Sequence, residues 1–220
     1  CIILDASSPP PPPPPASPPP PPNAPFPPPP APVYNATWGW GWGLISDDDE
    51  LQGDAAEEGS AVDVAISSDG SRIAIGASNA DGTGGMRYGG RTRVFEYNST
   101  NWVQVGDDLV GNGNFGKNVG LSKDGKLVVV AAPGEGNDYA GVVRVYEETD
   151  SEWTQLAQNL TGDEDFSWYG SDVLISTTNT KRVFVAGGKT TDGVFAGIVR
   201  AYEYRAPSDD PEKTNLGWLQ

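Results

Sequence analysis

Acidic side chains cluster at three places in this 220-residue chain, and neighbouring carboxylates are groups that can do chemistry. The clusters are residues 47–50, the pair Asp107 and Asp108, and residues 163–165, where Asp163 and Asp165 stand two positions apart. Two facing carboxylates can serve as acid and base in hydrolysis, and several carboxylate oxygens can bind calcium. The simpler interpretation, which we favour, is solvated loop charge that keeps an aromatic-rich domain soluble.

Three tryptophans form a second group with chemical potential. Trp38, Trp40 and Trp42 alternate with glycine, so in an extended strand all three indoles would stand on one face. Such a face could be a platform on which a sugar stacks. The ordinary alternative is that these tryptophans pack an outer or closing strand against the rest of the domain.

The composition excludes several classes of site. With no His, Ser-His-Asp and Cys-His catalysis and His-ligated zinc are excluded, and a single Cys excludes intrachain disulfides and thiolate clusters. The formal net charge of −16 would repel nucleic acid and anionic lipid headgroups. The longest apolar run, residues 127–132, is far too short to span a membrane.

Residues 1–36 differ in composition from the rest of the chain. Of the 21 prolines, 18 lie between Pro9 and Pro32, a composition that favours a stiff polyproline II segment. We interpret this segment as a linker or stalk that holds a domain away from a surface or a neighbouring module. A ligand for aromatic-lined grooves, or a glycosylated stalk of the hydroxyproline type, are the alternatives.

Residues 37–220 contain an internal repeat. Residues 90–97, 141–148 and 197–204 share the pattern Gly-x-x-Arg-x-aromatic-Glu, and a tryptophan follows each of them: Trp102, Trp153 and Trp218. Two apolar segments precede each copy, and Asp-Gly joins them in the first two units, which is a strong hairpin signal because the turn needs positive φ. In the third unit Asn179-Thr180 occupies the turn.

Each unit therefore predicts four short strands and no helix. The first two strands are apolar enough to be buried on both faces, and the last two alternate between apolar and polar residues. Repeated four-stranded units of this length are typical of the blades of a β-propeller, whereas a solenoid needs shorter repeats. We expect an all-β fold, a partial β-propeller of about three blades at about residues 60–105, 116–157 and 170–220. Propellers have about four to eight blades, so this chain would be a fragment that forms an open arc.

The repeated residues resemble the FG-GAP repeat family, whose members form the blades of integrin-α-type β-propellers and include a secreted subgroup in marine microbes and algae. The resemblance covers about residues 42–220. It is carried by Trp-x-Gln, Leu-x-Gly, Phe115-Gly116 and Tyr169-Gly170, Asp-Gly, Ala131-Ala132-Pro133 and Gly-x-Val-Arg-x-Tyr-Glu. It implies a propeller that binds protein or glycan partners without catalysis.

The calcium loop of that family does not match this chain. Calcium-binding members carry Asp-x-Asp-x-Asp-Gly between the first two strands, because calcium requires six to eight oxygen ligands. Here the connections are Ser67-Ser-Asp-Gly70 and Ser122-Lys-Asp-Gly125, with one carboxylate each. We therefore expect no metal site, no cofactor and no catalytic residue.

Three Asn-x-Thr sequences are potential sites of N-glycosylation, at Asn35, Asn98 and Asn159. Asn98 falls in the tight turn before Trp102, where a glycan would be exposed.

The sequence as a whole favours an extracellular or cell-surface adhesion module that binds a protein or glycan ligand through its propeller loops. A propeller-type glycosidase or lyase, and a purely structural wall or matrix protein, are the alternatives. The aspartate boxes of sialidases, Ser-x-Asp-x-Gly-x-x-Trp, do not occur in the chain.

Overall fold

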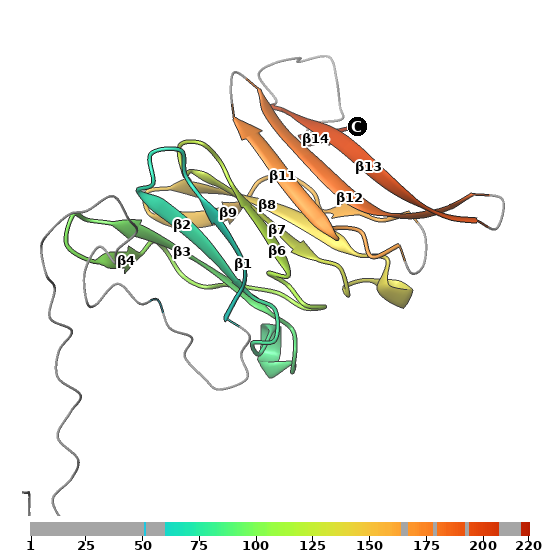
Figure 1. Cartoon of the computed structure of the whole chain (residues 1–220), viewed down its shortest axis with the longest axis horizontal. Coiled ribbons are helices and arrows are strands. Elements are labelled where there is room, and N and C mark those ends of the chain that lie inside the picture. Colours follow the sequence, from blue (N-terminus) through green and yellow to red (C-terminus); the bar gives the residue numbers. More distant parts are fainter. Residues whose placement is uncertain (1–50, 52–59, 164–166, 178–179, 192–193, 207–216) are drawn as a thin grey trace, which may run out of the picture. The chain divides into compact units, whose positions relative to one another are not determined.

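The computed structural model describes residues 51, 60–163, 167–177, 180–191, 194–206 and 217–220, all within the unit Gly43–Gln220. This part of the chain is all-β, as expected: 14 strands form three antiparallel sheets of four or five strands, none of them closed (Figure 1). Two 3-10 turns, η1 (Thr83–Gly85) and η2 (Asn137–Tyr139), interrupt the strands, and the described residues include no α-helix.

Each sheet is built from consecutive strands. The first sheet comprises β1 (Ser60–Ile66), β2 (Arg72–Ala77), β3 (Arg91–Tyr97), β4 (Trp102–Gln104) and β5 (Leu109–Val110). The second comprises β6 (Asn118–Leu121), β7 (Leu127–Ala132), β8 (Val142–Thr149), β9 (Glu152–Gln155) and β10 (Leu160–Thr161). The third comprises β11 (Asp172–Thr177), β12 (Lys181–Thr191), β13 (Val194–Arg205) and β14 (Gly217–Leu219). The strands expected from the repeat are thus present, but β12 and β13 are not short: they have 11 and 12 residues.

The short strands β5 and β10 were not expected. In the first two sheets the outer strand is interrupted, so that β4 and β5 both pair with β3, and β9 and β10 both pair with β8. The chain leaves the edge at Gly106 and Ala157, both at positive φ, and then returns to it. A strand of two residues has too short an alternation to be recognised in a sequence.

The Asp-Gly turns have the predicted conformation. Gly70 and Gly125 have φ values of 74° and 70°, a left-handed conformation that glycine adopts without strain, and the flanking strands pair in antiparallel register. Of the third turn, Thr180 is described, whereas Asn179 lies outside the described residues.

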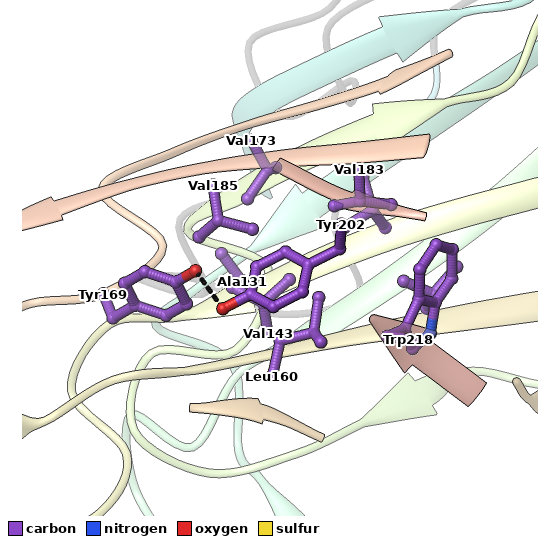
Figure 2. Packing of buried hydrophobic residues seen from close by; sticks show 11 residues of the cluster. Ala131, Val143, Leu160, Tyr169, Val173, Val183, Val185, Tyr202 and Trp218 are labelled. Carbon is purple, nitrogen blue, oxygen red and sulfur yellow. Dashed lines mark hydrogen bonds between the residues drawn. The ribbon is translucent and has the colours of Figure 1, made fainter. Parts of the chain in front are cut away.

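The three sheets pack face to face, with the second sheet in the middle. One of its faces, with Val119, Val128 and Val130, packs on Ala74 and Val94 of the first sheet. Its other face packs on Val183, Val185 and Tyr202 of the third sheet through Val129, Ala131, Val143 and Val145 (Figure 2). Between the second and third sheets the Tyr169 hydroxyl donates a hydrogen bond of 2.7 Å to the Tyr202 hydroxyl. Burial, followed by this hydrogen bond, raises the pKa of Tyr169 above its ordinary value.

Two glycines, Gly90 and Gly141, allow the Phe115-Gly116 and Tyr169-Gly170 motifs to approach the backbone of the preceding sheet closely. Gly90 and Gly141 have φ values of 101° and 85°, and a Cβ on them would lie 2.0 Å from the Phe115 carbonyl oxygen and 2.2 Å from that of Tyr169. The aromatic residue before each next sheet therefore lies against the start of β3 or β8, and only glycine permits this approach.

The recurring tryptophans Trp102, Trp153 and Trp218 make structural contacts. The Trp153 indole donates a hydrogen bond of 2.8 Å to the carbonyl of Val105, directly after β4 of the first sheet. The Trp218 indole donates one of 3.0 Å to the carbonyl of Leu156, directly after β9 of the second sheet. Trp102 packs on Tyr97 at a centroid distance of 5.3 Å. Trp153 and Trp218 therefore connect neighbouring sheets near their outer edges, and Trp102 packs at the edge of its own sheet.

Both of the first two strands of a unit are buried on both faces only in the second sheet; in the first sheet this holds for β2 over residues 74–77 but not for β1. Several apolar side chains on the outer faces of the first and third sheets are exposed: Val64 and Ile66 in β1, and Leu174 and Val199, at 64% and 68%, in β11 and β13. The prediction of burial on both faces is thus confirmed for β2 of the first sheet, and it is wrong for β1 and for the third sheet. Their strands are equally apolar, but among the described residues only the second sheet has a sheet on either side.

Candidate functional site

Of the three acidic clusters, the structure describes Asp107, Asp108 and Asp163. Asp108 lies 2.9 Å from Nη1 of Arg91 and accepts a hydrogen bond of 2.8 Å from Gln104, while Asp163 pairs with the guanidinium of Arg200. Asp107 is exposed, and residues 47–50, Glu164 and Asp165 lie outside the described residues. The described residues contain no group of three or more His, Cys, Asp or Glu side chains that could hold a metal ion.

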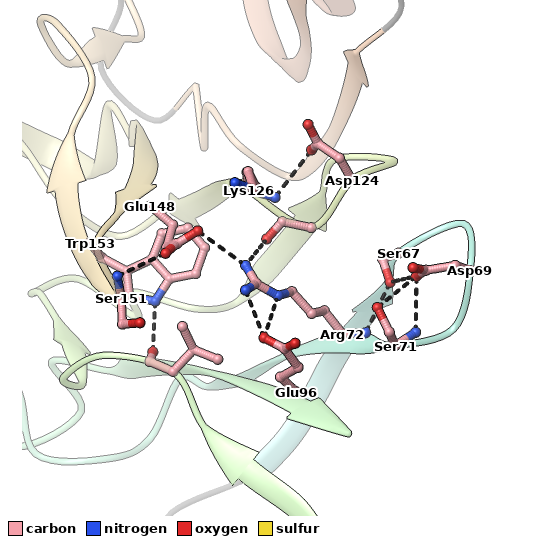
Figure 3. A network of polar contacts seen from close by, with 12 residues as sticks. Ser67, Asp69, Ser71, Arg72, Glu96, Asp124, Lys126, Glu148, Ser151 and Trp153 are labelled. Carbon is pink, nitrogen blue, oxygen red and sulfur yellow. Dashed lines mark hydrogen bonds and ion pairs between the residues drawn. The ribbon is translucent and has the colours of Figure 1, made fainter. Parts of the chain in front are cut away.

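The aspartates of the Asp-Gly hairpins brace their own turns (Figure 3). Asp69 accepts hydrogen bonds from the Ser67 hydroxyl at 2.7 Å and from the Ser71 amide and hydroxyl at 3.0 and 2.8 Å. The Ser67 hydroxyl, followed by the two Ser71 groups, lowers the pKa of Asp69 from 3.8 to about 2. Asp124 accepts a hydrogen bond of 2.6 Å from Ser122 in the same arrangement. Each carboxylate thus stabilises a turn.

The remaining predicted positions are surface features or lie outside the described residues. Asn98 and Asn159 are exposed; the Asn98 side chain accepts hydrogen bonds from the amides of Thr100 and Asn101 at 3.0 and 2.9 Å. Glycosylation at these positions stays a prediction. Asn35 and the three tryptophans Trp38, Trp40 and Trp42 lie outside the described residues.

All three sheets contribute to a pocket of about 300 Å³ that the sequence did not reveal. It lies where β2 and β7 end and where β6 and β11 begin, and we call it the loop-end pocket. Its lining is Ser78, Asn79, Asn114, Lys117, Asn118, Pro133, Trp168 and Ser171. Three amides and two hydroxyls thus surround one tryptophan, one proline and one lysine.

The loop-end pocket has a distinct charge. The chain carries 30 Asp and Glu side chains, yet none of those that the structure describes lines this pocket, and Lys117 is the one charged residue in the described lining. Two of the amides are held in place: Asn118 donates a hydrogen bond of 2.8 Å to the Gly170 carbonyl, and Asn114 donates one of 3.4 Å to the Ser78 carbonyl. The described lining thus combines partly preorganised neutral amides and hydroxyls with one positive charge, and it suits an uncharged polar ligand or an anion.

Trp168 forms the aromatic side of the loop-end pocket. Its ring stacks on Tyr139, with ring centroids 4.9 Å apart and an interplanar angle of 11°, and both side chains are exposed. Both residues also adopt positive φ, 46° for Trp168 and 61° for Tyr139, a conformation that is strained for bulky side chains.

A larger hollow of about 470 Å³ lies near the outer strands of the first and second sheets. Its lining includes four acidic side chains and Trp153, whose indole NH is already bound to Val105. Asp108 in this lining is paired with Arg91. The loop-end pocket is therefore the better candidate for a ligand-binding site.

The part of the chain that the structure describes contains no helix of the length and apolarity needed to cross a membrane.

No protein-family model and no curated protein matches this chain.

Proposed function

We propose that this chain is a non-catalytic, extracellular or cell-surface binding module that takes a protein or glycan partner at the loop-end pocket. The pocket carries this proposal, because it combines partly anchored amides and hydroxyls with an exposed aromatic ring, and none of the described residues of its lining is a carboxylate. Binding pockets are typically concave sites with a few well-placed polar groups. An acid–base hydrolase would need two free carboxylates that converge on one site.

In this proposal the three sheets are consecutive blades of an integrin-α-type propeller. Equivalent positions of the repeat form the contact between adjacent sheets in both cases. Thr92 and Val94 of the first sheet face the second sheet, and Val143 and Val145 of the second sheet face the third. Val199 stands at the matching position on the exposed face of the third sheet. Leu174 there is larger than the matching residues, Ala65 and Gly120, so a further blade would have to pack around it.

The location of the protein outside the cell is supported by its composition. The sequence has a proline-rich segment of the kind found in stalks and three potential glycosylation sites. In this interpretation residues 1–36 display the module away from a surface.

A binding screen with the 220-residue chain tests the proposal. We expect the labelled chain to bind selected members of an array of immobilised oligosaccharides and cell-surface proteins, and to hydrolyse no member of a panel of aryl glycosides. Binding to nothing on the array would favour a purely structural protein. Turnover of a glycoside would mean that the module is an enzyme.

A further inference from the structure

Trp168 stands at a position of the fold that does not need a tryptophan. The repeat places Asn114, before Phe115-Gly116, at the same position that Trp168 has before Tyr169-Gly170. Asn114 donates its backbone amide to the Tyr88 carbonyl at 3.2 Å, and Trp168 donates its own to the Tyr139 carbonyl at 3.1 Å. The φ values also agree, at 62° for Asn114 and 46° for Trp168. Asparagine therefore satisfies the same backbone geometry one sheet earlier.

Tryptophan is also an unfavourable residue at this position. Left-handed φ is tolerated by Asn and costs about 1 kcal/mol or more for bulky residues. The Trp168 side chain is 46% exposed, so its indole adds little to the core. Because neither backbone geometry nor core packing accounts for this residue, its role is to be sought at the surface.

The stacked pair of Trp168 and Tyr139 presents a flat aromatic surface beside neutral hydrogen-bonding groups. Ser78, Asn79, Asn118 and Ser171 line the same pocket as Trp168. Amides and hydroxyls both donate and accept hydrogen bonds, which suits a ligand rich in hydroxyl groups. An aromatic ring adds dispersion contacts with the apolar C–H face of such a ligand.

We propose that the loop-end pocket binds a carbohydrate, with a sugar ring lying on Trp168 and its hydroxyls bound by the neighbouring amides and serines. The pocket volume of about 300 Å³ suits a terminal sugar or a short segment of a glycan. A peptide fits less well, because the lining offers one flat aromatic surface and no deep apolar pocket for a side chain. This inference rests on the proposed function, since it names the ligand class of that site.

The substitution Trp168→Asn tests this assignment, because it installs the residue that the repeat already uses. The variant and the wild-type chain are applied to immobilised neutral, uronate-bearing and sulfated oligosaccharides, and the best-bound oligosaccharide is then titrated in solution by calorimetry. We expect Trp168→Asn to weaken its binding by about tenfold or more, while the melting temperature stays the same or rises. Trp168→Phe, which keeps a smaller ring, should lose less.

Tyr88→Ala is the matched control. Tyr88 has the same left-handed backbone as Tyr139 and is also exposed, but it does not line the pocket, so binding should be unchanged. If Trp168→Asn binds the oligosaccharide as tightly as wild type, or if the chain binds only proteins, the carbohydrate assignment is wrong and the binding function stands. If the chain binds neither class, both are wrong.

Discussion

Arg72 links the first two sheets, and its loss should cost more stability than the loss of the corresponding arginine in the third sheet. Its Nε and Nη2 bind the Glu96 carboxylate at 3.0 and 2.7 Å within the first sheet. Its Nη1 reaches the second sheet, at 3.2 Å from the Gly125 carbonyl and 3.3 Å from Glu148 (Figure 3). The Arg72 side chain is 15% exposed, so these contacts are partly shielded from water.

The expected loss follows from the two contacts that cross between the sheets. A hydrogen bond to a charged group contributes about 1.5 kcal/mol or more, and removing one partner of a shielded ion pair leaves the other unpaired. We therefore expect Arg72→Met, which keeps the apolar stem, to lower the free energy of unfolding by about 2–3 kcal/mol in urea denaturation.

Arg182 provides the control for that measurement. It binds Glu203 at 2.9 and 2.8 Å, as Arg72 binds Glu96, but its side chain is 52% exposed on the outer face of the third sheet. Arg182→Met should cost about 0.5 kcal/mol or less, as exposed ion pairs do. Equal losses for the two variants would refute the argument, because the difference between them measures the bonds that cross between the sheets.

Three further outcomes can be checked. Tyr169→Phe should lower the free energy of unfolding by about 1–2 kcal/mol in urea, since the buried Tyr202 hydroxyl loses its hydrogen-bond donor; an unchanged midpoint would contradict this. The pKa of Asp69 is depressed in the fold, from 3.8 to about 2, so the stability it contributes is present above pH 3.8 and is lost as the pH falls toward 2. Asp69→Asn should flatten the acid limb of a plot of melting temperature against pH, and an unchanged slope would exclude this role. Expression in a eukaryotic secretory host should attach a glycan at Asn98, detected as a mass shift that peptide-N-glycosidase removes and that Asn98→Gln abolishes.

The strands could be predicted from the sequence because their signals are local. Asp69-Gly70 and Asp124-Gly125 specify the hairpins by the conformation that glycine permits, and the repeat shows which segments are equivalent. Burial could not be predicted in the same way, because it depends on what lies beside a sheet. Leu174 and Val129 are both apolar strand residues, yet Leu174 is exposed and Val129 is fully buried.

The loop-end pocket was missed because its lining comes from single residues that flank the strands, between Ser78 and Ser171. Only the packing of the sheets brings them together, so no local motif marks them. One signal was available in the repeat. Trp168 replaces Asn114 directly before the aromatic-glycine pair, and a comparison of the units at that position would have identified the exceptional residue.

The stacking of the three sheets also determines how the protein opens. In the described part of the chain each outer sheet contacts one neighbour, whereas the second sheet is packed on both faces. In such an array, detachment of an end unit breaks one interface, and opening of the middle unit breaks two. Amide hydrogens of β7 should therefore exchange with solvent the most slowly, and those of β11 should exchange through partial openings that leave the rest of the array intact. Since the loop-end pocket takes Trp168 and Ser171 from the segment leading into β11, its ligand would slow this partial opening.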